Sequence, residues 1–235
     1  MQKESKYAIF NYKETDKDLI EELAEYLDTH AQKVFDFFDT EVPKEKITIN
    51  IIPTKKEFDE IFIFDHEWTH SIPDFKVPNW AIGYFKNNQI TYLSINDYKN
   101  TSHAFKEENY PSAILYYKKT IVHEFIHYVN DLFRIKHDCS YTEKYLSEGI
   151  ATFLSEQKEN KNIEFNFTLE QIMSYDMKKT CYDGWYLVTK FLVENYDKDF
   201  VFELFKSNRQ AREFLQSELY EKAKKYYSEE EEKQI

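Results

Sequence analysis

Hydrophobic and polar positions alternate with different periods along the chain, and each period predicts a type of element. Over residues 16–38, apolar side chains recur every three or four positions, which indicates an amphipathic helix. Over 47–51, isoleucines alternate with polar residues, which predicts a strand that stops at Pro53. A capping box formed by Thr54 and Glu57 then predicts the start of a short helix.

Two more apolar runs, 80–85 and 90–95, flank the polar residues 86–89 and predict a β-hairpin. From Pro111 onward the apolar period becomes helical. We expect one long helix there and a second from about Ser140 to about Gln157. Three further helices are expected over 168–175, 181–196 and 198–226.

These elements predict an α+β fold in a single domain, residues 1–235. The N-terminal part, residues 1–110, is expected to be a mixed α/β sub-domain with a small sheet and an edge hairpin. The C-terminal part, residues 111–235, is expected to be mostly helical. Its first helix would carry the residues with the clearest chemistry.

Composition limits the classes of partner and compartment. The formal charge of −12 disfavours nucleic acid, whose phosphates select basic surfaces. No apolar run approaches the ~18 residues of a membrane span, and no signal peptide is visible. We therefore expect a cytoplasmic protein as the sequence stands, or a secreted or surface-attached one if an upstream signal has been removed. Cys139 and Cys181 form no disulfide framework, and whether they pair is left open.

The pattern H-E-x-x-H occurs twice, at residues 66–70 and 123–127. On a helix, the two histidines of this pattern lie one turn apart and can bind one zinc ion, and the glutamate can activate a zinc-bound water. The first copy follows a helix that is already ending, and Pro73 lies just beyond it. We interpret this copy as a polar, aromatic loop or helix end.

The second copy lies in the middle of a long helical pattern. His123 and His127 fall on a polar stripe that also contains Asn130, away from the apolar face of Ile121 and Phe125. We expect the helix to bury its apolar face and to offer this stripe to a cleft. The next helix carries Glu148, which would point away from its own apolar face. Two imidazoles and one carboxylate form the ligand set of a catalytic zinc with one open position.

The second motif, His-Glu-Phe-Ile-His at 123–127, and Ser-Glu-Gly-Ile-Ala at 147–151 resemble those of the gluzincin metallopeptidases, the clan of thermolysin and aminopeptidase N. The chain most resembles small bacterial peptidase-MA-like domains, in which a Trp-x-x-Gly-Tyr hairpin, here 80–84, precedes the zinc helix. The resemblance covers about residues 45–205. It implies a zincin-like fold, one Zn²⁺ ion and a peptide or protein substrate.

The resemblance also implies roles for single residues. His123, His127 and Glu148 would bind the zinc, and Glu124 would act as general base. An oxyanion donor would be a tyrosine on a later helix, with Tyr182 as first choice and Tyr186 as second. Two further positions would support the metal ligands through hydrogen bonds, namely Asp131 and Thr152, where Thr152 replaces the aspartate of thermolysin-like sequences.

The hairpin would offer Gly83, Tyr84 and Phe85 as an edge strand that pairs with an extended substrate. The segment 81–85 lacks the G-x-M-x-N pattern by which aminopeptidases of this clan hold a free amine, so the sequence favours an endopeptidase. The alternative is a catalytically silent zinc-binding domain that acts as a protein-binding or assembly module. Glu124 argues against that alternative, because a structural zinc site needs no base.

Overall fold

The computed structural model describes residues 1–101, 110–139, 141–159, 162–175 and 181–232 of the 235-residue chain. Contacts within the chain divide it into two compact units, Met1–Val129 and Asn130–Ile235. This division falls inside the long helix α5, Tyr110–Lys136, and not at its start. Most of α5 therefore belongs with the residues that precede it.

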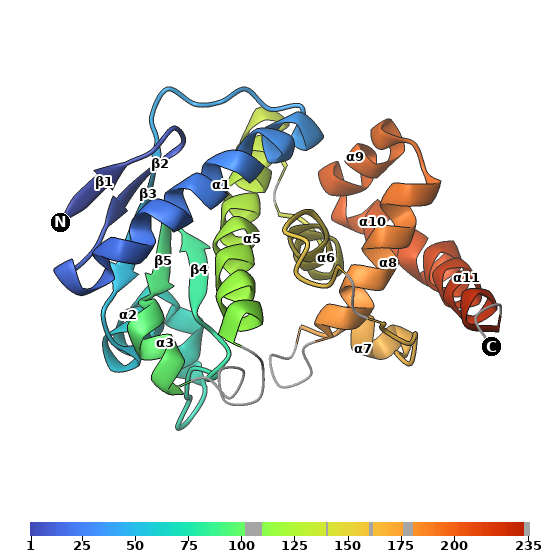
Figure 1. Cartoon of the computed structure of the whole chain (residues 1–235). Coiled ribbons are helices and arrows are strands. Elements are labelled where there is room, and N and C mark those ends of the chain that lie inside the picture. Colours follow the sequence, from blue (N-terminus) through green and yellow to red (C-terminus); the bar gives the residue numbers. More distant parts are fainter. Residues whose placement is uncertain (102–109, 140, 160–161, 176–180, 233–235) are drawn as a thin grey trace. The chain divides into compact units, whose positions relative to one another are not determined.

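The N-terminal unit contains a five-stranded mixed sheet in the order β1-β2-β3-β5-β4 (Figure 1). Its strands are β1 (Gln2–Glu4), β2 (Ala8–Asn11), β3 (Ile47–Ile52), β4 (Gly83–Lys86) and β5 (Gln89–Leu93). The three central strands β2, β3 and β5 are parallel, and β1 and β4 run antiparallel to their neighbours. The predicted hairpin thus supplies β4 as an edge strand of this sheet.

Helices cover the two faces of the sheet unequally. The helices of this unit are α1 (Lys17–Phe38), α2 (Lys55–Asp65), α3 (Ile95–Thr101) and the first part of α5. On one face, Phe125 of α5 packs with Phe35 of α1 and with Tyr7, with ring centroids 5.7 Å and 6.4 Å away. On the other face, Phe58 of α2 packs against Tyr84 of β4 at 5.7 Å. Apolar side chains therefore pack on both faces of the sheet.

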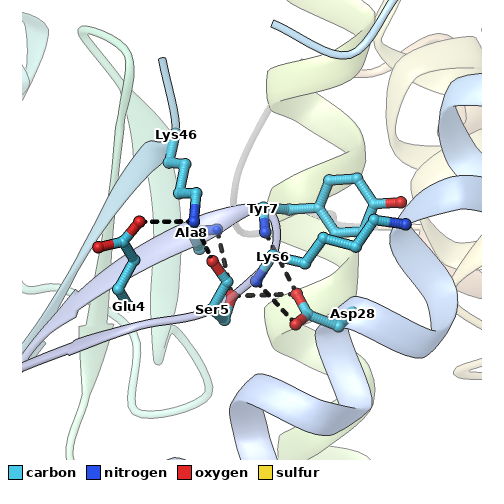
Figure 2. Close-up of polar contacts among 7 residues, drawn as sticks. All are labelled: Glu4, Ser5, Lys6, Tyr7, Ala8, Asp28 and Lys46. Atoms are coloured by element: carbon cyan, nitrogen blue, oxygen red, sulfur yellow. Dashed lines mark hydrogen bonds and ion pairs between the residues drawn. The ribbon is translucent and has the colours of Figure 1, made fainter. Parts of the chain in front are cut away.

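The carboxylate of Asp28 attaches the β1–β2 turn to α1 (Figure 2). It accepts hydrogen bonds from the Ser5 hydroxyl at 3.0 Å and from the backbone N–H groups of Lys6 and Tyr7 at 2.9 Å and 3.3 Å. On the adjacent side of the turn, Lys46 donates to Glu4 at 2.7 Å. Because these hydrogen bonds satisfy the donors of the turn, they hold the β1–β2 turn in place against α1.

The elements predicted for this unit are confirmed, with adjusted bounds. Thr54 caps α2, because its side chain accepts from the Glu57 N–H. The hairpin turn is shorter than the four polar residues predicted, since its two central residues are Asn87 and Asn88 at φ 50° and 59°. Both values lie in the left-handed region, which asparagine tolerates and which a tight type I′ hairpin turn requires.

The C-terminal unit is helical in all its described elements. After the end of α5 these are α6 (Lys144–Leu154), α7 (Leu169–Met173), α8 (Tyr182–Asn195), α9 (Lys198–Lys206), α10 (Asn208–Phe214), the π-helical turn η4 (Leu215–Leu219) and α11 (Tyr220–Glu232). Gly149 lets α6 approach α8 closely, because a Cβ there would lie 2.1 Å from Thr189 Oγ1 and 2.6 Å from the Trp185 carbonyl oxygen. Any larger residue would push the two helices apart.

Two predicted helix bounds were wrong. The single helix expected over 198–226 is interrupted at Ser207, whose extended backbone and side-chain bond to the Gln210 N–H begin a new helix. Helix α6 begins at Lys144 and ends at Leu154, and not near Ser140 and Gln157. Ser140 itself lies outside the described residues.

Two further expectations concern membrane-spanning segments and the pairing of the cysteines. None of the helices there has both the length and the apolar character needed to cross a membrane. Cys139 and Cys181 are both free thiols, and Cys181 is buried. Burial raises the pKa of the Cys181 thiol to about 11, so that it stays protonated at neutral pH.

Candidate metal centre

Helix α5 carries the histidines of the second motif one turn apart, as predicted. His123 Nε2 and His127 Nε2 lie 3.1 Å from each other, and the two ring planes are inclined by 80°. His123 is buried and His127 is half-buried. Two imidazole nitrogens therefore point at one shared position beside the helix.

Much of the polar stripe around these histidines is buried. Thr120, His123 and Asn130 are each less than a tenth exposed. Asn130 lies 3.5 Å from both the Ser147 hydroxyl and the Thr142 hydroxyl, and these contacts tie the end of α5 to the start of α6. Helix α5 thus has buried residues on its polar side as well as on its apolar side.

Glu148 of α6 completes the predicted ligand group. One ligand atom from each of His123, His127 and Glu148 lies within 4.8 Å of the other two. Ser147, the neighbour of Glu148, is the residue that contacts Asn130 of α5, and Gly149 on its other side packs against α8. The backbone of α6 around Glu148 is therefore held on both sides by packing.

The geometry of this group fits a divalent metal ion. A four-coordinate zinc with Zn–N bonds of about 2.0–2.1 Å holds two nitrogens roughly 3.3 Å apart, close to the spacing of the two imidazoles. Two neutral imidazoles and one carboxylate also form the donor set of catalytic zinc sites, with a fourth position left for water or substrate. This donor set suits a first-row transition metal such as Zn²⁺ better than Ca²⁺ or Mg²⁺, which prefer oxygen ligands.

Glu124, the glutamate of the same motif, lies against the edge strand. It is buried, and a Cβ built on Gly83 of β4 would lie 3.1 Å from its Cγ and 2.6 Å from Tyr92 Cδ2. Only a glycine allows the strand to approach both side chains this closely. The sheet edge and the candidate base are therefore next to each other.

The first motif has a different local structure. His66 ends α2, and residues Glu67–Ser71 form the short 3-10 helix η2. The His66 ring stacks on Phe62 at 4.2 Å, and its Nδ1 lies 2.8 Å from the Phe62 carbonyl oxygen. Burial lowers the pKa of His66, and the backbone bond to Phe62 opposes this shift. The prediction that this copy is an aromatic helix end is confirmed.

Other predicted residues have mainly local partners. Asp131 forms an ion pair with Arg134 at 2.7 Å, and the Thr152 hydroxyl donates to the Glu148 carbonyl oxygen at 2.8 Å. The ring of Tyr182 lies 5.1 Å from that of Trp185. Tyr186 is buried, and burial raises the pKa of its hydroxyl. Thr152 thus supports the backbone of α6, and an oxyanion donor among these tyrosines stays a prediction.

Sequence reasoning missed a polar cluster at the start of α6. The Glu143 carboxylate, which is 8% exposed, accepts a hydrogen bond from the Tyr175 hydroxyl at 2.5 Å and pairs with Arg212 at 3.2 Å. Arg212 also donates to the Tyr175 hydroxyl at 3.1 Å. The three residues are far apart in the sequence and belong to no motif, so no local pattern could have indicated the cluster.

Comparisons of the chain with family models, with curated proteins and with solved structures found no match.

Proposed function

We propose that the protein is a zinc-dependent peptidase with a zincin-like fold, which cleaves within peptide chains. The observation that carries this proposal is the convergence of ligand atoms from His123, His127 and Glu148 within 4.8 Å. Glu124 supports it, because this carboxylate lies between the two histidines in sequence and beside the edge strand in space. A purely structural site would need neither.

Different groups at the site would act as Lewis acid, general base and oxyanion donor. A bound zinc ion would supply Lewis acidity, which lowers the pKa of a bound water to about 7 and polarises a carbonyl group. Glu124 would accept the proton of the attacking water and pass it to the departing amine. Its low exposure keeps bulk water away and strengthens its electrostatic interactions. The oxyanion donor is assigned to Tyr182, with Tyr186 as the alternative.

Strand β4 would hold the substrate in an extended conformation. In the register of the hairpin, Ile82 accepts from the Leu93 N–H at 2.7 Å, and Tyr84 lies opposite Thr91. The backbone groups of Gly83 and Phe85 alternate with these and point to the outer edge. A peptide that pairs with them would run past Glu124, the proposed base.

The proposal is tested by Glu124→Gln, with Glu67→Gln of the first motif as the matched control. Both proteins are loaded with zinc and given N-terminally blocked, internally quenched peptides. We expect Glu124→Gln to keep about one zinc per chain and to lose activity by roughly 10²–10⁴-fold, since it can no longer accept a proton. Glu67→Gln, exposed at the other motif, should keep the activity of the wild type.

The same measurement separates the peptidase from a silent zinc-binding module. A wild-type protein that binds zinc and cleaves no peptide of a broad library would contradict the proposed activity and favour the module. Cleavage of peptides only when their amino terminus is free would instead indicate an aminopeptidase.

A further inference from the structure

Exposed apolar side chains are frequent at the end of α2 and in the segment that connects it to β4. Of the ten exposed large apolar side chains found among the described residues, four lie within 64–80. They are Phe64, Trp68, Ile72 and Trp80, at 80%, 41%, 43% and 50% exposure. Trp68 lies in the 3-10 helix η2 and Ile72 follows its last residue, and we call these two residues the aromatic patch. Large apolar side chains exposed along one short helix of an otherwise acidic protein indicate a binding function.

Ring contacts connect this patch to the edge strand. The Tyr84 ring of β4 lies 5.0 Å from His66, and His66 lies 6.2 Å from Trp68. Trp68 in turn packs against Phe75 at 5.2 Å. The Tyr84 hydroxyl donates to Asp65 at 2.6 Å, which fixes the inner end of the series. The contacts with His66 and Phe75 therefore hold the Trp68 side chain in place, with part of it exposed.

The alternation of β4 gives the patch a specific relation to a bound peptide. The side chain of Tyr84 lies on the α2 face of the sheet, whereas Gly83 lies on the face of α5 and Glu124. A peptide strand added at the edge alternates its side chains in the same way. Every second side chain of that peptide would therefore lie on the α2 face, the face of Tyr84 and of the rings that follow it.

We propose that the aromatic patch receives the bulky apolar side chains of an extended peptide substrate paired with β4. This inference rests on the proposed peptidase function and adds a substrate class, namely peptides with large apolar residues at alternate positions. The patch would bind those side chains by removing apolar area from water, while the strand would hold the backbone.

The edge strand is what selects this occupant over two others. A membrane surface offers no backbone groups to pair with Gly83 and Phe85, and a net charge of −12 opposes binding to anionic lipid. A second copy of the chain could cover the patch, and it would then make the protein dimerise through Trp68.

The test uses the zinc-loaded Glu124→Gln protein, so that binding is measured without turnover. Two blocked, fluorescein-labelled peptides of equal length are compared by anisotropy, one with Phe and the other with Ser at alternate positions. Trp68→Ala and Ile72→Ser are each added to this background. The matched control is Leu115→Ala, which removes an apolar side chain of similar exposure from α5.

We expect Trp68→Ala to weaken binding of the Phe peptide by about tenfold, as for an exposed aromatic anchor, and Ile72→Ser by a few-fold. Binding of the Ser peptide, zinc content and the thermal midpoint should stay near the parent values, as should all values of the control. Equal losses for both peptides, or no loss for either, would overturn the proposal. So would a dimer, seen by sedimentation, that Trp68→Ala dissociates.

The outcomes also separate this inference from the proposed activity. If the Phe peptide binds through Trp68 and the zinc-loaded wild type cleaves nothing, the docking surface stands and the peptidase fails. If the wild type cleaves both peptides with equal KM, the peptidase stands and the docking surface fails.

Discussion

The two H-E-x-x-H motifs of this chain have the same pattern and different structures. The copy at 123–127 lies within a 27-residue α-helix, which keeps His123 and His127 one turn apart with their Nε2 atoms at 3.1 Å. The copy at 66–70 begins where α2 ends and continues as a 3-10 helix. A 3-10 helix has three residues per turn, so the two histidines of this copy do not share a face.

The difference shows that the surrounding structure decides whether the motif can form a metal site. The second copy has a third ligand, Glu148, and a strand that approaches its glutamate at Gly83. The first copy places His66 among aromatic rings, where it serves packing. Within the described residues, the group of potential metal ligands contains the second pair of histidines and omits the first.

The largest difference between the two copies is expected when one histidine is removed from each. His123→Ala should lower the zinc content from about one ion per chain to near zero, because two remaining ligands cannot hold a catalytic zinc tightly. His66→Ala should leave the zinc content at about one. Elemental analysis after dialysis against a weak chelator measures both, and a metal lost only from the His66 variant would reverse the assignment.

A second change tests whether packing of α6 supports the second copy. In Gly149→Ala, the added methyl would meet Thr189 and the Trp185 carbonyl, so α6 must move away from α8. We expect unfolding free energy to fall by about 1–3 kcal/mol and zinc affinity to fall with it. Chemical denaturation and zinc competition with a chelating dye give the two values.

The control for that change is Gly184→Ala in the same unit. Its added methyl would meet the sulfur of Cys181 and the ring of Phe167, side chains that do not belong to the α6–α8 contact. It should lower stability and leave zinc affinity unchanged. An equal loss of zinc affinity in both variants would mean that general destabilisation, and not the position of Glu148, controls the metal.

A smaller effect is expected from the polar cluster at the start of α6. Arg212→Met removes the cation that pairs with the buried Glu143 carboxylate and should cost about 1 kcal/mol of stability, with a few-fold loss of zinc affinity. Arg209→Met, which breaks an exposed pair with Glu213 on the same helix, should change neither. Identical zinc affinities for the two variants would show that the cluster does not position Glu148.

The smallest effect concerns His66 and pH. Because burial lowers the pKa of His66 below its usual 6.5, the unfolded chain binds a proton more readily than the folded one. Its contribution to stability is therefore present above pH 6.5 and is lost as the pH falls below that value. His66→Phe should remove this part of the acid sensitivity, measured as the difference between urea midpoints at pH 7.5 and pH 5. An unchanged difference would contradict a buried neutral histidine.

The local pattern of the sequence determined the elements that depend on neighbouring residues. The period of apolar residues placed α1, β3 and α5 correctly, because burial of one face is decided within a few turns. Thr54 and the paired asparagines of the hairpin likewise act through bonds and backbone angles of adjacent residues. The pair His123 and His127 was also accessible, since its spacing follows helix geometry. Glu148 was indicated by its place away from the apolar face of the next predicted helix and by the family resemblance.

Only the tertiary structure decided the features that join distant segments. The need for glycine at position 83 comes from its close approach to Tyr92 and Glu124, and the need for glycine at position 149 comes from its packing against α8. The cluster of Glu143, Tyr175 and Arg212 and the burial of the polar stripe on α5 also arise from packing. Short-range preferences act along the chain, whereas contacts and burial depend on which segments the fold brings together. For that reason the sequence indicated which residues to suspect, and the fold decided that one H-E-x-x-H copy lies beside an edge strand and the other within an aromatic cluster.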